Sequence, residues 1–310
     1  MSAKTMQERE TFLFAFFREL RRNEDKCYRV DPRRLGNRHI RFMVKRWLGR
    51  GLAPATIQLY MSFLRTFSNW IGKPELALDL ERYIDDPQRY QRSYCALEDK
   101  SWSAHGVDAE RMFEAMSAID RYAAAQLAMK AAFGLRRKEA LMLQPHRQVV
   151  TAREARIEDA PCEFYLDLLK GTKGGRRRYL PIDTERKRLA LARACAVARG
   201  PNDHLGHPGR TLKQNLRRVD YVMAKLGVTH QALGITGHGL RHEYANDLYE
   251  KESGAAPPLR GGSEVSRSLD RDARLKVAHD LGHGRVEVSG AYLGGLLKAR
   301  SSASESDSKA

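Results

Sequence analysis

The sequence predicts a mainly α-helical chain with one small β-sheet, divided into two domains. A length of 310 residues suits two domains that each bury a core. Apolar residues recur at intervals of three and four through most of the chain, which is typical of amphipathic helices. A single pair of β-rich segments flanks the glycine-rich run from Lys170 to Gly175, and this arrangement indicates one hairpin.

Residues 1–98 are predicted to form a helical domain. One helix is expected over about residues 37–48, with Ile40, Met43, Val44 and Trp47 facing inward. A second helix can begin at Ala53-Pro54 and stop at Gly72. Its apolar positions are spaced three and four apart: Ile57, Tyr60, Leu64, Phe67 and Ile71.

The second domain is predicted to span residues 109–298, after a polar linker over 99–108. An alanine-rich helix is expected from Arg121 to Phe133, and the hairpin strands over 163–169 and 177–182. Two segments are expected to lack regular structure. Residues 254–272, rich in Gly, Pro and Ser, read as a long surface loop, and the serine-rich tail 299–310 as disordered.

Composition indicates which kind of partner the protein binds and where in the cell it is located. The formal net charge of +17 and the pI of about 9.9 favour a polyanionic partner such as nucleic acid. The four cysteines lie far apart with no C-x-x-C pair, so we expect reduced thiols rather than a zinc or redox centre. The apolar run 12–17 is too short to span a bilayer, and a cytoplasmic location is expected.

The strongest chemical pattern lies near the C-terminus. His238-Gly239-Leu240-Arg241 places an imidazole and a guanidinium three positions apart, on one face of a helix. The planar fork of a guanidinium grips two phosphate oxygens, and the imidazole beside it is a titratable donor. His283 follows in Leu281-Gly282-His283, and Tyr292 lies nine residues later. Because a tyrosine hydroxyl can act as a nucleophile, this set predicts covalent cleavage of a nucleic-acid backbone.

Five motifs, in this order, resemble those of the tyrosine recombinase (phage-type integrase) family. They are Gly134-Leu135-Arg136, a hairpin lysine, His-x-x-Arg, Leu-Gly-His and the tyrosine, and they cover roughly residues 125–296. Ala53-Pro54-Ala55-Thr56 and the helix after it resemble the family's core-binding domain. The resemblance implies a helical core-binding (SAM-like) N-terminal domain and a mixed α/β tyrosine recombinase catalytic domain.

The resemblance also implies a set of catalytic residues, carried over position by position: Arg136, Lys173, His238, Arg241, His283 and Tyr292. Arg136 is preferred to the adjacent Arg137 because it follows Gly-Leu directly. Glu139 is implied as the partner that holds Arg136, with an ordinary surface ion pair as the alternative. Tyr244 and Tyr249 share the helix of the His-x-x-Arg motif, and we expect them to pack in the core.

In the implied reaction, Tyr292 attacks a phosphodiester and stays joined to the 3′ phosphate while a 5′-hydroxyl leaves. The two arginines stabilise charge on the non-bridging oxygens. The lysine protonates the departing oxygen, and the two histidines exchange protons with the phosphate. The phosphotyrosyl link retains the bond energy, so neither ATP nor a metal nor any other cofactor is expected.

The catalytic lysine is expected at the hairpin tip, where Lys170 and Lys173 both qualify. Thr172-Lys173-Gly174 fits the family's pattern better, and Lys170 is then an ordinary turn lysine. Five further basic residues are candidate contacts to DNA phosphates, with a solvated surface as the alternative: Lys45, Arg46, Arg176, Arg177 and Arg178.

The expected partner is double-stranded DNA with specific recombination sites, bound by a homotetramer, with DNA-bending accessory proteins as further partners. Two other functions stay open. One is a type IB topoisomerase-like enzyme that relaxes DNA as a monomer, and the other is a DNA-binding regulator on the same fold without turnover. A zinc site on the pairs His238/His242 and His279/His283 is disfavoured, because neither contains the glutamate of an H-E-x-x-H motif.

One segment departs from the family pattern. The stretch from Arg241 to His283 is about twenty residues longer than in compact members, and the excess lies around Ala255-Ala256-Pro257-Pro258. A loop there leaves room for a contact specific to this lineage or for control of the tyrosine segment.

Overall fold

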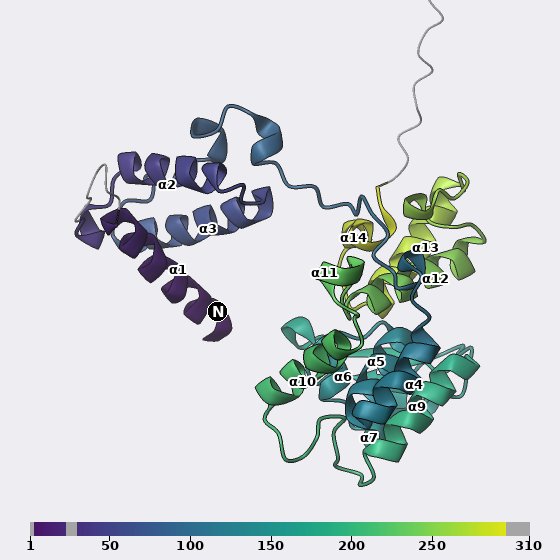
Figure 1. Ribbon diagram of the computed structural model, residues 1–310. Coiled ribbons are helices and arrows are strands. Elements are labelled where there is room, and N and C mark those ends of the chain that lie inside the picture. Colours follow the sequence, from purple (N-terminus) through teal and green to yellow (C-terminus); the bar gives the residue numbers. More distant parts are fainter. Residues whose placement is uncertain (1–2, 23–29, 296–310) are drawn as a thin grey trace, which may run out of the picture. The chain divides into compact units, whose positions relative to one another are not determined.

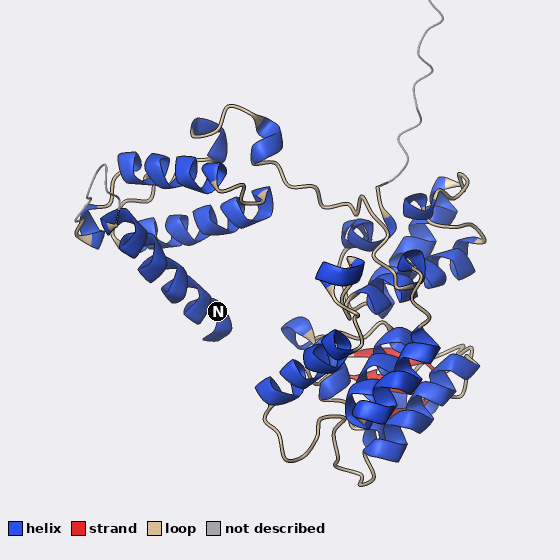
Figure 2. Cartoon of the chain, in the orientation of Figure 1, coloured by secondary structure: helices blue, strands red, loops and turns tan. Residues whose placement is uncertain are grey.

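The computed structural model describes residues 3–22 and 30–295 and divides the chain into two units, Met1–Ser93 and Tyr94–Ala310. The predicted tail 299–310 lies outside the described residues. Figure 2 shows that helices dominate both units and that strands occur in the second. None of the helices in the described ranges combines the length and the apolar character that crossing a bilayer requires.

The first unit is helical, as the apolar spacing predicts. Its core is formed by apolar side chains from all three α-helices, among them Phe16, Trp47 and Leu64. Pro54 begins the third helix, where a proline loses no intrahelical hydrogen bond. The elements are α1 (Ala3–Arg21), η1 (Pro32–Arg34), α2 (Asn37–Gly49), α3 (Pro54–Trp70), η2 (Leu80–Arg82) and η3 (Pro87–Arg89).

The second unit begins before the predicted linker ends. Trp102 is completely buried in the core of this unit, and its indole Nε1 donates a hydrogen bond to the Thr236 carbonyl oxygen at 2.9 Å. The elements up to the hairpin are η4 (Ser103–His105), α4 (Ala109–Ile119), α5 (Arg121–Phe133), α6 (Arg137–Leu141), α7 (Pro145–Gln148), β1 (Val149–Thr151) and α8 (Ala152–Ala155).

The remaining elements carry the hairpin and most of the predicted site. They are β2 (Phe164–Leu168), η5 (Lys173–Gly175), β3 (Arg178–Pro181), α9 (Glu185–Val197), α10 (Leu212–Lys225), α11 (His230–Leu233), α12 (Gly239–Ser253), η6 (Pro258–Arg260), α13 (Arg267–Asp280), η7 (Val286–Ser289) and α14 (Gly290–Leu293).

The helix α5 is the centre of the second unit. Every residue of this helix from Ala123 to Phe133 is buried, because α4, α9 and α12 pack around it (Figure 1). Its many alanines allow these helices to approach closely. A second cluster, which includes Tyr244, Tyr249 and Leu281, joins α12 to α13 and α14. The two tyrosines after the His-x-x-Arg motif therefore pack in the core, as predicted.

The predicted hairpin forms the larger part of the sheet. Strand β2 pairs antiparallel with β3, placing Leu166 opposite Leu180, and β1 pairs with the other edge of β2. Strand β1 was not predicted, because three residues are too short to display a two-residue alternation.

The predicted surface loop over 254–272 ends earlier than expected, because its last residues belong to a helix. Residues Pro258–Arg260 form a 3₁₀ turn, and α13 begins at Arg267. The Ser266 hydroxyl accepts a hydrogen bond from the Leu269 backbone N–H and caps this helix.

Candidate active site

Four elements that are distant in the sequence bring five of the six predicted catalytic side chains to one region of the second unit. Arg136 immediately precedes α6, and His238 and Arg241 lie at the start of α12. His283 follows the end of α13, and Tyr292 lies in α14. The side chain of Lys173 lies outside the described part of the structure.

The turn before Arg136 depends on its glycine. Gly134 ends α5 with a φ of 61°, in the left-handed region that favours glycine. A Cβ at this position would lie 2.5 Å from the Tyr244 ring. The chain can therefore reverse direction here, and the Gly134 carbonyl oxygen accepts a hydrogen bond from Arg241 Nη1.

Tyr292 is positioned by two of the predicted residues. Its hydroxyl lies 3.2 Å from Arg241 Nε and 3.3 Å from His283 Nε2. Its ring contacts the imidazoles of His238 and His242, with ring centroids 6.2 and 4.9 Å away. The side chain is only 6% exposed. The hydroxyl therefore faces a guanidinium and an imidazole rather than open solvent.

Arg241 is completely buried and links three segments through its guanidinium. Nη2 donates to the Leu281 carbonyl oxygen at 2.6 Å and lies 3.3 Å from His283 Nε2, while Nη1 donates to Gly134. Together with the bond from Nε to Tyr292, these contacts join the ends of α5 and α13 to the tyrosine helix. A lysine ammonium has no planar fork with which to make this set of contacts.

Glu139 organises a second arginine. Its carboxylate accepts hydrogen bonds from the backbone N–H of Arg136 and from Arg136 Nη1, each at 2.8 Å. Arg178 donates to both oxygens of the same carboxylate, at 3.1 and 2.8 Å, and to the Asp280 carbonyl oxygen at 2.9 Å. Glu139 is fully buried, so it is not the surface ion pair that was the alternative. This network holds Arg136 and connects it to the segment that carries His283.

Positive charge accumulates around His238. Loss of hydration is the largest cause that lowers the pKa of this imidazole to about 3, and its neighbours add to it: His242, Lys130, Arg241 and Arg136. His238 is therefore neutral at pH 7 in the DNA-free site. An anionic phosphate bound beside Arg136 and Arg241 would offset the effect of their charges and favour the protonated imidazole of His238.

The predicted DNA contacts have different environments. Lys45 is exposed on α2, and the adjacent Arg46 pairs with Glu19 at 2.5 Å. Arg177 makes a two-pronged ion pair with Asp167, at 2.8 and 2.6 Å. The exposed guanidinium of Arg176 lies against Gly284, next to His283.

Arg178 corrects the prediction of a DNA contact. The residue is 4% exposed, and its guanidinium is engaged by Glu139 and the Asp280 carbonyl. Arg178 is the first residue of β3 and is buried, whereas Arg177 precedes the strand and is exposed. The run of three arginines at 176–178 does not indicate from the sequence which of them is buried.

The hairpin tip packs against the arginine segment. A Cβ on Gly171, whose φ is 78°, would lie 2.8 Å from the Lys138 carbonyl oxygen. Lys170 donates a hydrogen bond to Gln144 Oε1 at 2.7 Å. The tip that carries both candidate lysines is therefore adjacent to the segment that carries Arg136 and Glu139.

Sequence reasoning missed Lys130. This lysine is buried within α5 and donates a hydrogen bond to the carbonyl oxygen of Gly237, the residue before His238. Burial, the largest cause, and the charge of Arg137 lower the pKa of its ammonium to about 7. The available signal was a lone lysine in an alanine-rich helix without a polar face.

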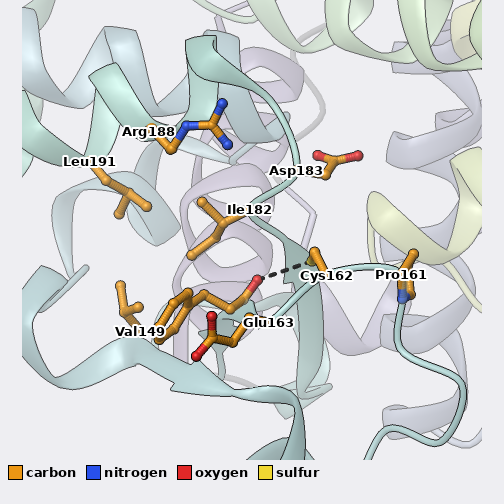
Figure 3. Close-up of a pocket in the computed structure, with 9 residues that line it drawn as sticks. Val149, Pro161, Cys162, Glu163, Ile182, Asp183, Arg188 and Leu191 are labelled. Atoms are coloured by element: carbon orange, nitrogen blue, oxygen red, sulfur yellow. Dashed lines mark hydrogen bonds between the residues drawn. The ribbon is translucent and has the colours of Figure 1, made fainter.

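One hollow on the surface lies apart from this site. A cavity of about 600 Å³ lies between the sheet and α9 (Figure 3), and it contains none of the predicted catalytic residues. Its lining is Val149, Pro161, Cys162, Glu163, Phe164, Ile182, Asp183, Arg188 and Leu191. Among the described residues, no group of three or more His, Cys, Asp or Glu side chains is placed to hold a metal ion.

The network around Glu139 predicts a pH-dependent contribution to stability. Burial raises the pKa of this carboxyl, but the hydrogen bonds and charge of Arg178 and the bonds from Arg136 outweigh it and lower the pKa to about 2. The charged Glu139 therefore contributes to the free energy of unfolding at pH values above 4.5, the ordinary pKa of a glutamate, and this contribution is lost as the pH falls towards 2. At pH 7, Glu139→Gln should destabilise the protein by about 3–5 kcal/mol, the cost of removing one partner of a buried pair.

Urea unfolding of the wild type and of Glu139→Gln at a series of pH values measures this effect. The difference in free energy of unfolding should be constant from pH 7 to about pH 5 and should shrink below that. Glu154→Gln is a matched control, because Glu154 is an exposed carboxylate that also accepts hydrogen bonds at a helix start. Equal small effects of the two substitutions would contradict the assignment of a buried, charged Glu139.

Residues 103–247 match the model of the family described as integrase. No curated protein matches the chain by sequence. Among solved structures, a lambda integrase dimer bound to a COC′ core site is 15% identical, covers 99% of this chain and 93% of its own, and has a TM-score of 0.54.

Two further structures have the same fold. The XerH site-specific recombinase bound to a palindromic difH substrate is 16% identical over 91% of this chain and 72% of its own, with a TM-score of 0.53. The Tn1549 transposon integrase in complex with transposon right end DNA is 13% identical over 93% and 88%, also with a TM-score of 0.53. The predicted fold class, mainly α with a small sheet and a catalytic domain of this type, is confirmed.

Proposed function

We propose that this chain, which belongs to the tyrosine recombinase family, breaks and rejoins DNA strands at specific sites through a 3′-phosphotyrosyl intermediate. One observation carries the proposal. The Tyr292 hydroxyl lies between Arg241 Nε and His283 Nε2, at 3.2 and 3.3 Å, in the cationic region that also includes Arg136 and His238.

The reaction transfers a phosphoryl group between two oxygens. The Tyr292 oxygen attacks phosphorus, its proton passes to a neighbouring acceptor, and the bond from phosphorus to the 5′ oxygen breaks. His283 Nε2 is within reach of the hydroxyl and is suited to share that proton. A 5′-hydroxyl then attacks the phosphotyrosyl link in the reverse sense and releases Tyr292. Neither step consumes ATP, because the ester bond is conserved.

Arg136 and Arg241 stabilise the negative charge that develops on the non-bridging oxygens of the phosphate. Arg136 is 21% exposed, and one of its nitrogens is held by Glu139, which leaves the other donors of its fork for a phosphate. Arg241 uses two nitrogens on backbone carbonyls and presents Nε to the tyrosine. We therefore assign the phosphate grip mainly to Arg136, and both positioning of Tyr292 and charge stabilisation to Arg241.

Double-stranded DNA is the proposed partner. The net charge of +17 supports binding to a polyanion. One solved relative is described as a lambda integrase tetramer bound to a Holliday junction, with 15% identity and a TM-score of 0.55. By analogy, we propose four protomers of this chain on two DNA sites. The sequence also predicts that an apolar stripe in the C-terminal segment, which includes Leu296 and Leu297, docks between protomers; these two residues lie outside the described residues.

A nicked suicide substrate tests the proposed function against the two alternatives. Formation of a covalent protein–DNA adduct would exclude a regulator that only binds DNA. Exchange of strands between two separate sites would exclude an enzyme that only relaxes DNA. Specific binding without any adduct, under conditions in which the 5′ fragment can leave irreversibly, would overturn the proposal.

The proposed role of Lys173, to protonate the departing 5′ oxygen, can be tested with a leaving group that needs no proton. We expect Lys173→Ala to slow cleavage by about 10²–10⁴, the range for loss of a general acid. A substrate with sulfur in place of the 5′ bridging oxygen should restore the rate, because a thiolate leaves without being protonated. Rates of adduct formation on both substrates measure the effect.

Lys170→Ala is the matched variant, since it removes the same charge from the same hairpin tip. Its ammonium bonds Gln144, so we expect a smaller loss that sulfur does not correct. If sulfur restored cleavage only in Lys170→Ala, the two lysines would exchange roles.

A further inference from the structure

The segment that lengthens the chain between Arg241 and His283 contains a compact turn, residues 257–262. Three backbone hydrogen bonds close it. The N–H groups of Arg260 and Gly262 donate to the Pro257 carbonyl oxygen at 2.8 and 3.3 Å, and the Gly261 N–H donates to the Pro258 carbonyl oxygen at 3.1 Å. A Cβ on Gly262 would lie 1.6 Å from the Ala256 carbonyl oxygen, so the two ends of the turn are in direct contact. Two consecutive prolines further restrict the backbone.

Arg260 projects from this turn onto the segment that enters the second unit. Nε donates to Asp99 Oδ2 at 2.9 Å, and Nη2 donates to the Ser101 hydroxyl at 3.1 Å. Nη1 donates to Asp247 Oδ1 on α12 at 3.1 Å. Arg260 is 22% exposed and Asp99 15%, so this ion pair is largely sheltered from solvent and less screened than an ordinary surface pair.

The same turn contacts the segment that carries the tyrosine. Leu259 packs against Gly294, where an added Cβ would lie 3.2 Å from the Leu259 backbone nitrogen. Gly294 has a φ of 81°, so glycine satisfies both the backbone and the close approach. From α13, Arg274 Nη1 donates to the Gly294 carbonyl oxygen at 3.2 Å.

A third contact joins the segment that enters the second unit to the segment that carries Tyr292. The Ala96 backbone N–H donates to the Gly290 carbonyl oxygen at 2.8 Å, which joins the entering segment directly to the start of α14. Residues 96–101, the turn 257–262 and residues 290–294 therefore contact one another pairwise. Tyr292 lies within the third of these segments, between its contacts at Gly290 and Gly294.

We propose that the turn 257–262 is a brace that holds the segment 290–294 in place, with Arg260 as a positioning residue for Tyr292. This inference rests on the proposed function for its catalytic consequence, but the brace itself is a structural claim. Arg260 acts through residues 96–101 and does not touch the reacting atoms. The short helix α14 has only four residues, so it needs such external contacts to keep its orientation.

Loss of the brace should affect the chemical step more than DNA binding. We expect Arg260→Ala to lower the single-turnover rate of adduct formation at least about tenfold, because small misplacements of a reacting group are costly. The dissociation constant for DNA should stay within about twofold. Asp99→Asn should slow the same step, but less than Arg260→Ala does, because Arg260 keeps its bonds to Ser101 and Asp247. The effect of the double variant should be smaller than the product of the two single effects, since the two variants share the Arg260–Asp99 interaction.

Hydrogen exchange measures the brace without relying on activity. Amides of residues 94–101 and 290–295, including that of Ala96, should exchange at least about tenfold faster in Arg260→Ala than in the wild type. Arg267→Ala is the matched control, because Arg267 is an exposed arginine in the same lengthened segment. It should change neither exchange nor cleavage. Arg260→Lys keeps the charge and should have an intermediate effect.

The two readouts separate the possible failures. Unchanged exchange in Arg260→Ala and Asp99→Asn would overturn the brace. Faster exchange of both segments with normal cleavage would overturn the positioning role. If the wild type formed no adduct, the proposed function would fail, and exchange of residues 290–295 would still decide whether Arg260 holds them. Should Arg260→Ala not fold, Arg260→Lys and Asp99→Asn provide the same comparison.

Discussion

Tyr292→Phe is expected to abolish the covalent protein–DNA adduct while DNA binding persists. The substitution keeps the ring that packs against His242 and deletes only the hydroxyl that faces Arg241 and His283. Without that oxygen no phosphotyrosyl bond can form, so the loss should be complete rather than partial. Denaturing gels with a labelled suicide substrate measure the adduct, and gel shifts measure binding.

Tyr244→Phe is the matched control for this experiment. Tyr244 is also a buried tyrosine near the site, but its hydroxyl donates a hydrogen bond to Asp280 Oδ2 at 2.9 Å. Burial, the largest cause, and the charge of Asp280 raise its pKa well above the ordinary value. This variant should lose stability and retain adduct formation. A denaturant-resistant adduct in Tyr292→Phe would refute the assignment, and Tyr244 and Tyr249 would then be the next nucleophiles to test.

Replacing either arginine of the proposed catalytic set, Arg136 or Arg241, with lysine is expected to reduce cleavage by about 10² or more, the scale for one preorganised charge-stabilising donor. Lysine keeps the charge but loses the planar fork. Arg137→Lys is the control, because Arg137 is an adjacent exposed arginine that pairs with Asp220. Near-normal cleavage by both Arg136→Lys and Arg241→Lys would rule out the proposed phosphate grip.

Stability should distinguish the two arginines. Arg241 is fully buried and bonds the carbonyl oxygens of Gly134 and Leu281, so Arg241→Lys should also lower the melting temperature. Arg136 is partly exposed, and its backbone N–H bond to Glu139 survives the substitution, so Arg136→Lys should lose cleavage with little loss of stability. Cleavage rates and thermal unfolding of the same samples provide this comparison.

Much of the fold was predictable because its signals are local. The spacing of Ile57, Tyr60 and Leu64 depends on the geometry of one helix, and α3 follows it. The glycine-rich tip between two β-rich segments likewise depends only on neighbours in the sequence. The candidate catalytic residues were recognisable because their motifs occur in a fixed order, although their roles stay predictions until they are tested.

The sequence by itself determined the helices, the hairpin and the residue types that can bind a phosphodiester, since each of these depends on a short stretch of chain. Only the tertiary structure decided that Arg178 is an internal partner of Glu139, that Lys130 supports the turn before His238, and that Arg260 reaches Asp99. Arg178 and Glu139 are 39 positions apart in the sequence, Lys130 and its partner Gly237 are 107 apart, and Arg260 and Asp99 are 161 apart. Local periodicity carries no information about such contacts, because burial and ion pairing arise only when distant segments pack together.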